Sequence, residues 1–299
     1  MRAGGTWVRL SPCRALCGTT PDEFAGLLVR LAPLVEADKA QREQRPGRRR
    51  APGAGGKPKP FSFRLLVALT HLRQGLALRS SAAIFGVDEK SVRNWRDEIE
   101  RLLTAHGCVP PGAVRPVRSL EDLTAYLADD ERAVIVDGVE VPRNRPGGGW
   151  DAQKSAYSGK SHRHVVKATV VTDEEGNPLW FEANPSGEGR THDLGMLRSQ
   201  TGLLAALGGA WAVLGDLGYL GLAHDIGEER VIIPEHRRGG RVLTDSDKIH
   251  NRDLAVLRVR VEHAIGRMKN WKAMRHHRRQ PHLLNGTGRA ALVLTSLLS

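Results

Sequence analysis

Two short apolar runs, each leading into an aspartate, constrain the fold more than any other feature of the chain. Residues Ala133–Val136 precede Asp137, and residues Trp211–Gly215 precede Asp216. Both runs are uniformly apolar, which is typical of strands that are buried on both faces of a sheet. Because such strands need helices over both faces, we expect an α/β domain.

The rest of the second half of the chain predicts alternating strands and helices. Further strands are predicted at Val165–Thr172, Leu179–Glu182 and Val231–Ile233, and helices near Leu194–Leu207 and Leu254–Trp271. Mixed elements of this kind indicate a three-layer α/β domain, which we place at residues 130–299.

The positions of the two aspartates suggest a metal site. A carboxylate just past the end of a buried strand lies where open α/β sheets place their ligands. Two such carboxylates on neighbouring strands would repel each other, and a divalent cation would relieve the repulsion. Oxygen donors suit Mg²⁺ or Mn²⁺. Either aspartate alone could simply cap a turn, but the pair Asp137 and Asp216 favours metal binding.

A third acid lies on the predicted helix near the C-terminus. The buried stripe of this helix is Leu254, Leu257, Val261, Ile265 and Met268. Arg258, Glu262 and Lys269 share an adjacent face at spacings of four and seven residues. Glu262 could form an ordinary ion pair with Arg258. Alternatively, it could be a third metal ligand, with the cations around it binding a phosphate backbone.

The first half of the chain predicts helices only. A helix at residues 21–40 belongs to an N-terminal helical segment over residues 1–44. Three further helices are predicted at Phe63–Arg73, Ser80–Phe85 and Glu89–Leu103. The tight turn Gly86–Asp88 between the last two is typical of a helix-turn-helix, so we predict an all-α domain of this type at residues 61–109.

The third of these helices carries polar residues that fall off its apolar stripe, namely Lys90, Arg93, Asn94 and Arg96. These side chains are expected to reach phosphates and base edges in a major groove. The alternative is a plain three-helix bundle with solvated arginines. Residues 45–60 form a basic Pro/Gly linker, and residues 110–129 hold a second linker and a short helix from Leu120 to Ala128.

Composition excludes several classes of protein. The net charge of +12 is consistent with a polyanionic partner. The most apolar stretch, Ala205–Leu214, is far too short to cross a bilayer. The chain has 3 cysteines, an odd number in a long chain, which excludes a disulfide framework. No continuous apolar signal segment begins the sequence, so we expect a reduced, cytoplasmic protein.

Four motifs, in this order, resemble the DDE transposases of bacterial insertion sequences: VDGVEVP, YSGKSHRHVVKA, GDLGYLG and RVRVEHAIGRMKNW. The chain is most similar to the insertion-sequence-five (Harbinger-like) group, also described as DDE superfamily endonucleases. The similarity runs from about Phe61 to the C-terminus. It implies a ribonuclease-H-like catalytic domain at residues 130–299, preceded by the helix-turn-helix domain.

The resemblance also implies a catalytic triad of Asp137, Asp216 and Glu262 that holds two Mg²⁺ (or Mn²⁺) ions. Arg258 and Lys269 match the signature of the family around its Glu, whereas Ala255 replaces a preferred Tyr. The implied activity is metal-dependent cleavage of transposon ends followed by strand transfer into target DNA. A non-cutting DNA-binding protein derived from such an element, or an endonuclease without strand transfer, is the alternative.

The implied partner is double-stranded DNA, both terminal inverted repeats and target DNA, with no membrane involved. Since two ends must be joined, we expect a homodimer or a larger assembly on DNA, in the bacterial cytoplasm at the nucleoid. Lys160 and Arg163 are expected to contribute to the backbone groove. The Gly-rich segment Arg143–Gly149 lacks the Lys-Ser/Thr ending of a P-loop, and we predict a loop near the site.

Overall fold

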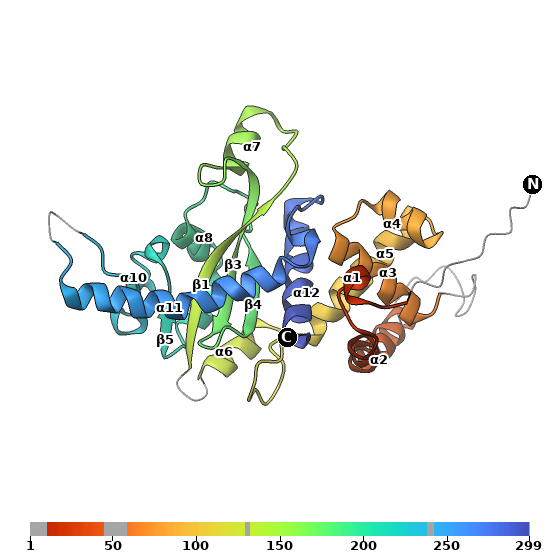
Figure 1. Cartoon of the computed structure of the whole chain (residues 1–299), viewed down its shortest axis with the longest axis horizontal. Helices are drawn as coiled ribbons and strands as arrows, with labels where there is room; N and C mark the ends of the chain where they lie inside the picture. Colours follow the sequence, from red (N-terminus) through yellow and green to blue (C-terminus); the bar gives the residue numbers. More distant parts are fainter. Residues whose placement is uncertain (1–10, 45–58, 129–131, 238–241, 299) are drawn as a thin grey trace, which may run out of the picture. The chain divides into compact units, whose positions relative to one another are not determined.

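The computed structural model describes residues 11–44, 59–128, 132–237 and 242–298 (Figure 1). The chain divides into two compact units, Met1–Glu98 and Ile99–Ser299, which are described separately below. The predicted basic linker lies outside the described residues except for Lys59 and Pro60. Among the described helices, none is both long and apolar enough to span a membrane.

The first unit is all-helical. Its helices are α1 (Arg14–Cys17), α2 (Pro21–Glu43), α3 (Phe61–Gln74), α4 (Leu78–Phe85) and α5 (Glu89–His106), the last of which continues into the second unit. Helix α2 begins at a capping box, in which the Thr20 hydroxyl accepts from the Glu23 N–H and Glu23 accepts from the Thr20 N–H. The side chain of Gln74 donates to two carbonyl groups of α1 and so ties α3 to it.

Helices α3 to α5 confirm the predicted helix-turn-helix. Helix α4 ends at Gly86, whose φ of 61° is readily adopted only by glycine. The Asp88 carboxylate then accepts from the Ser91 N–H at the start of α5. Phe63 packs edge-to-face against both Phe85 and Trp95, so the three helices share one small core.

The second unit is built on a mixed sheet. Its strands are β1 (Ala133–Pro142), β2 (Tyr157–Ser158), β3 (Arg163–Asp173), β4 (Pro178–Ala183), β5 (Ala212–Leu214) and β6 (Val231–Ile232). The strand order is β2-β3-β1-β5-β6, and β4 pairs with β3. Strand β3 is antiparallel to both β1 and β4, whereas β5 and β6 run parallel to β1. This arrangement confirms the predicted ribonuclease-H-like α/β domain.

The helices described in the rest of this unit are α6 (Leu120–Ala128), α7 (Gly149–Ala156), α8 (Asp193–Ser199), α9 (Thr201–Leu207), α10 (Ala223–Ile226), α11 (Asp245–Met268) and α12 (Leu284–Leu297). Several of them cover the faces of the sheet. On one face, Val134 and Val136 of β1 pack into a core with α6, α8 and α9. Helix α11 contacts β1 and β3, and α12 lies on β4 (Figure 1). Successive side chains of β1 point to opposite faces of the sheet, so this strand contributes to a core on each face.

Several predicted elements differ from the observed ones. The helix expected at Leu194–Leu207 is two helices, α8 and α9. Gln200 separates them. Its buried side-chain amide accepts a hydrogen bond from the Thr169 hydroxyl and donates one to the carbonyl of Glu182. Helix α11 starts earlier than predicted, after a capping box at Thr244. Helix α12 was not predicted, and Trp211 is exposed outside β5.

The packing of α12 on β4 predicts the effect of a one-carbon change. A Cβ atom at Gly288 would lie 2.1 Å from the ring of fully buried Phe181. We expect Gly288→Ala to lower the free energy of unfolding by about 1–3 kcal/mol through overpacking, measured by urea denaturation. Gly286→Ala is the matched control, because its nearest atom would be 3.6 Å away. Equal unfolding midpoints for the two variants would contradict the prediction.

Candidate active site

Strand register places Asp137 and Asp216 at the same level of the sheet. Ile135 of β1 is paired with Leu214 of β5, and each aspartate follows two residues later. The prediction that Asp137 lies past the end of its strand was wrong, because β1 continues to Pro142 through its pairing with β3. Strand β5 ends instead, which leaves the edge of β1 open beside Asp137.

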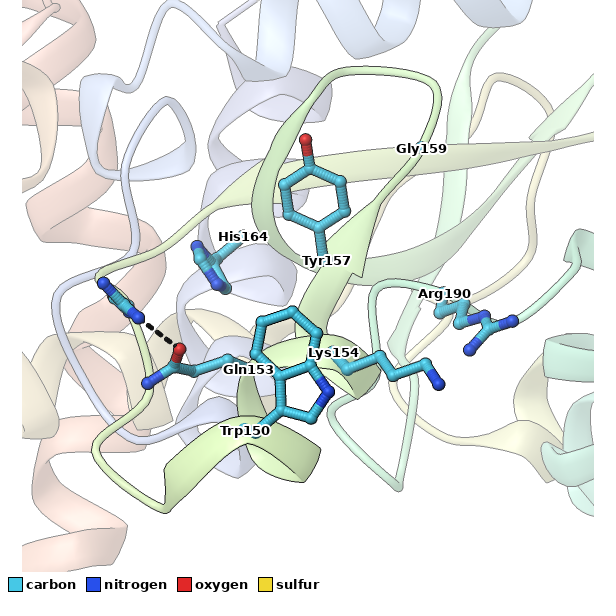
Figure 2. Close-up of a pocket in the computed structure, with 8 residues that line it drawn as sticks. Trp150, Gln153, Lys154, Tyr157, Gly159, His164 and Arg190 are labelled. Atoms are coloured by element: carbon cyan, nitrogen blue, oxygen red, sulfur yellow. Dashed lines mark hydrogen bonds between the residues drawn. The ribbon is translucent and has the colours of Figure 1, made fainter.

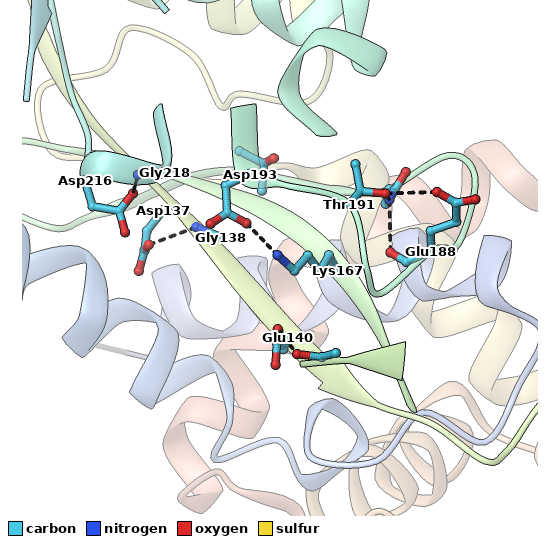
Figure 3. A network of polar contacts seen from close by, with 12 residues as sticks. Asp137, Gly138, Glu140, Lys167, Glu188, Thr191, Asp193, Asp216 and Gly218 are labelled. Carbon is cyan, nitrogen blue, oxygen red and sulfur yellow. Dashed lines mark hydrogen bonds and ion pairs between the residues drawn. The ribbon is translucent and has the colours of Figure 1, made fainter. Parts of the chain in front are cut away.

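Arg258 of α11 lies against this pair of carboxylates. Its Nη2 atom is 3.7 Å from Oδ2 of Asp216, and its side chain is only 17% exposed. The other oxygen of Asp216 accepts from the N–H of Gly218 at 2.8 Å, which holds the carboxylate at the turn after β5 (Figure 3). The Asp137 carboxylate accepts from the N–H of Gly138 at 2.9 Å. Backbone donors therefore orient both acids.

A third carboxylate at this site, Asp193, was missed by the sequence analysis. Asp193 is the first residue of α8, and its Oδ1 accepts from Lys167 of β3 at 3.0 Å (Figure 3). A Cβ atom at Gly138 would lie 2.7 Å from the Asp193 carboxylate, and one at Gly218 would lie 3.0 Å from it. The glycines that follow Asp137 and Asp216 were the available signal, since they make room for Asp193.

Burial and like charges perturb the titration of this site. Burial raises the pKa of Asp137 to about 6; the Arg258 charge opposes the rise, and the Asp216 and Asp193 carboxylates add to it. Burial also raises the pKa of Tyr219 well above its ordinary value, with further contributions from Asp193, Asp137 and Asp216. The Tyr219 hydroxyl is buried and makes no hydrogen bond within the described structure. An excess of negative charge is therefore concentrated here.

The perturbed pKa of Asp137 predicts a pH dependence of the metal-free protein. The folded-state value of about 6 exceeds the ordinary value of 3.8, so the folded protein binds more protons between these limits. Stability contributed by this group is therefore present at low pH and is lost as pH rises through about 6. In EDTA, we expect Asp137→Asn to be more stable than the parent by about 3 kcal/mol at pH 7 and nearly equal to it at about pH 3, below both pKa values. A difference that is constant with pH in urea titrations would contradict this.

Glu262 lies exposed on α11, one turn after Arg258. Within the described ranges, no three His, Cys, Asp or Glu side chains are close enough together to hold a metal ion. The structure thus brings Asp137 and Asp216 together but does not gather Glu262 with them. Lys269, two turns further along the same face, is half-buried, and burial lowers its pKa while the charge of Asp137 opposes this effect.

The predicted DNA contacts separate into exposed and buried residues. Lys90, Arg93 and Asn94 are exposed on α5. Arg96 is buried and its guanidinium donates to the Asp97 carboxylate, and its contact with DNA stays a prediction. Arg96 follows Val92 by four residues and precedes Ile99 by three, which is the spacing of a buried helix face.

Lys160 and Arg163 are exposed around the turn between β2 and β3. The Gly-rich segment Arg143–Gly149 is only partly a loop, since Gly149 begins α7. The exposed Trp150 lies in the first turn of α7, a helix that was not predicted.

An α/β sheet that places a carboxylate of β1 beside a second carboxylate just after β5, in a chain with a helix-turn-helix, is typical of DNA-directed phosphoryl-transfer enzymes. The comparisons with known proteins agree. Residues 136–297 match the family described as DDE superfamily endonuclease, and residues 60–108 match the helix-turn-helix of DDE superfamily endonuclease. The chain belongs to the DDE superfamily of endonucleases. Membership implies dependence on a divalent metal ion.

Two curated relatives resemble most of the chain. One, from Microchaete diplosiphon, is described as a probable transposase for insertion sequence element IS702 and is 25% identical over 84% of this chain and 82% of its own length. Another, from Streptomyces albus G, is assigned as a transposase for insertion sequence element IS112 and is 26% identical over 76% of this chain and 78% of its own. No solved structure gives a significant match. The narrower insertion-sequence-five assignment stays a prediction.

Proposed function

We propose that this DDE-type transposase cleaves the ends of its own DNA element and joins them to target DNA, using Asp137, Asp216 and Glu262 to hold two Mg²⁺ or Mn²⁺ ions. The observation that carries the proposal is the register of β1 and β5, which aligns Asp137 with Asp216. In the cleavage step, water attacks the phosphorus at the element end and the P–O3′ bond breaks, which frees a 3′-hydroxyl. In the joining step, that hydroxyl attacks a target phosphodiester and displaces the 3′-oxygen of the target strand.

The donor set fits a hard divalent cation. Carboxylate oxygens are the ligands that Mg²⁺ and Mn²⁺ prefer. Asp137, Asp216 and Asp193 influence one another electrostatically, while the charges opposing them come from Arg258 and Lys167. Additional positive charge would stabilise this arrangement. Bound metal ions would activate the attacking oxygen and stabilise the leaving oxygen.

The role of Glu262 rests on its place on α11. Arg258, Glu262 and Lys269 share one face of the helix, and both cations interact with the aspartates. Glu262 lies between these two cations along the chain, and the proposal brings its carboxylate to the aspartates when metal ions are bound. No hydrogen bond or ion pair in the described part of the chain engages the Glu262 carboxylate.

The remaining basic residues position the DNA. Lys160, Arg163, Arg258 and Lys269 bind the backbone near the bond that is cut, where their charges neutralise the phosphates. Lys90, Arg93 and Asn94 on α5 contact the terminal inverted repeats in a major groove. Joining two ends requires two active sites, so the active species is a homodimer or a larger assembly on DNA.

The test uses the purified full chain with labelled element ends, Mg²⁺ and a target plasmid. The end sequences come from the inverted repeats that flank the reading frame. Products in which the ends are joined to the plasmid support the transposase activity. Cut ends without joining would replace the proposal with an endonuclease, and binding without cutting would replace it with a DNA-binding protein that does not cleave.

A further inference from the structure

The second unit contains a cavity of about 580 Å³ that lies outside the candidate active site (Figure 2). Strands β2 and β3, helix α7 and the segment before α8 supply its walls. Its lining residues are Arg145, Trp150, Gln153, Lys154, Tyr157, Gly159, His164 and Arg190. None of the three proposed metal ligands lines this cavity, so the proposed cleavage chemistry does not account for it.

Exposed aromatic rings distinguish this cavity. Trp150 is 74% exposed and Tyr157 is 40% exposed, although burying such large rings is strongly favourable. Tyr157 and His164 are register partners on β2 and β3, and their rings pack edge-to-face with centroids 5.8 Å apart. Figure 2 shows the rings of Trp150, Tyr157 and His164 near one another, with the Lys154 side chain beside Trp150. The sheet and α7 thus present aromatic rings to solvent.

Cations surround the aromatic surface. Arg145, Lys154 and Arg190 line the cavity, and no salt bridge in the described ranges engages any of them. Arg145 donates to Gln153, which itself donates to the carbonyl of Pro146. The N–H groups of Gly189 and Arg190 both donate to the carbonyl of Ser155, so α7 and the Arg190 segment are held together. Aromatic rings and cationic side chains therefore occur together around the cavity.

The cavity lies along the same strands as the candidate active site. Asp137 is paired with Val170 of β3, and His164 lies six residues earlier on that strand. At the rise of a β-strand, six residues span about 20 Å. Between the two places, the Ser158 hydroxyl donates to Glu140 of β1 and ties β2 to the strand that carries Asp137. A DNA strand at about 3.4 Å per nucleotide covers this distance in about six nucleotides.

We infer that this cavity binds an unpaired base of the DNA on which the enzyme acts, about six nucleotides or fewer from the bond that is cut. The inference rests on the proposed function for its substrate. A single strand exposes base faces that stack on Trp150 and Tyr157, and its phosphates bind Arg145, Lys154 and Arg190. A duplex hides its base faces within the stack, so it would engage the cations but not the rings.

The test compares single-stranded and double-stranded DNA in EDTA, where no cutting occurs. Fluorescence anisotropy with a labelled oligothymidylate and with a labelled duplex gives the affinity of the full chain for each. We expect Trp150→Ala to weaken oligothymidylate binding about tenfold, the loss of one base stack, and to leave duplex binding unchanged. Trp150→Phe should retain most of the affinity. Trp211→Ala is the matched control, since Trp211 is also an exposed tryptophan, at 57%, but does not line the cavity.

Two outcomes would overturn the inference. One is unchanged oligothymidylate binding by Trp150→Ala, and the other is an equal loss for both DNA forms, which would assign Trp150 to a duplex surface. Because the measurement needs neither metal nor cleavage, it is separate from the test of the proposed function. A chain that fails to cut DNA but loses single-strand affinity through Trp150 would disprove only the proposed function.

Discussion

Asp137→Asn and Asp216→Asn are each expected to lower the rate of DNA cleavage by about a thousandfold or more, while binding of element ends is retained. Each substitution removes a negative charge from the aligned pair and leaves one neutral amide oxygen as a possible metal ligand. A thousandfold corresponds to about 4 kcal/mol of transition-state stabilisation, which is within the range that metal catalysis supplies. Glu262→Gln is expected to behave in the same way.

Cleavage of labelled ends in Mg²⁺ and gel-shift binding of the same ends measure these two properties separately. Asp245→Asn is the matched control, because Asp245 lies in the first turn of α11 with its side chain 93% exposed. Cutting by any of the three active-site variants at the rate of the parent would contradict the assignment of that residue. Loss of binding together with cleavage would indicate a folding defect, which thermal unfolding of the variants would detect.

Arg258→Met is expected to lower the cleavage rate about a hundredfold, the lower end of the loss caused by removing one preorganised donor that stabilises developing negative charge. Arg258 contacts Asp216 and opposes the rise in the pKa of Asp137. Without its charge, the carboxylates repel one another more strongly and the phosphate loses a positive neighbour. Arg258→Lys should recover part of the activity, since the charge is kept and the planar geometry is lost.

Arg260→Met provides the comparison for Arg258. Both arginines lie on α11, but Arg260 donates to the backbone carbonyl of Glu174 in the β3–β4 turn. Its loss should therefore change cleavage little. Equal cleavage rates for Arg258→Met and Arg260→Met under saturating DNA would show that position on the helix is immaterial, and would remove Arg258 from the proposed site.

Much of the fold was predictable from local patterns. Buried strands were predicted from uniformly apolar runs, because a strand covered on both faces has no polar side. The helix-turn-helix was predicted from helical periodicity interrupted at Gly86, where the backbone needs a left-handed residue. These features depend on neighbours in sequence, which is why the sequence predicts them well.

The failures share a different cause. The break at Gln200 depends on hydrogen bonds to β3 and β4, which no local pattern reports. Asp193 joins the other acids only because Gly138 and Gly218 let its carboxylate approach. In each case a distant partner determines the outcome.

By itself, the sequence determined that this chain carries a helix-turn-helix and an α/β domain with two aspartates after apolar runs, because periodicity and residue type report local conformation. Only the tertiary structure decided which carboxylates meet and how they are charged. The pairing of β1 with β5 aligns Asp137 with Asp216, although Asp137 lies in the middle of its strand. The packing of α8 and α11 then brings Asp193 and Arg258 to them, since electrostatic interactions depend on distance in space and not on separation along the chain.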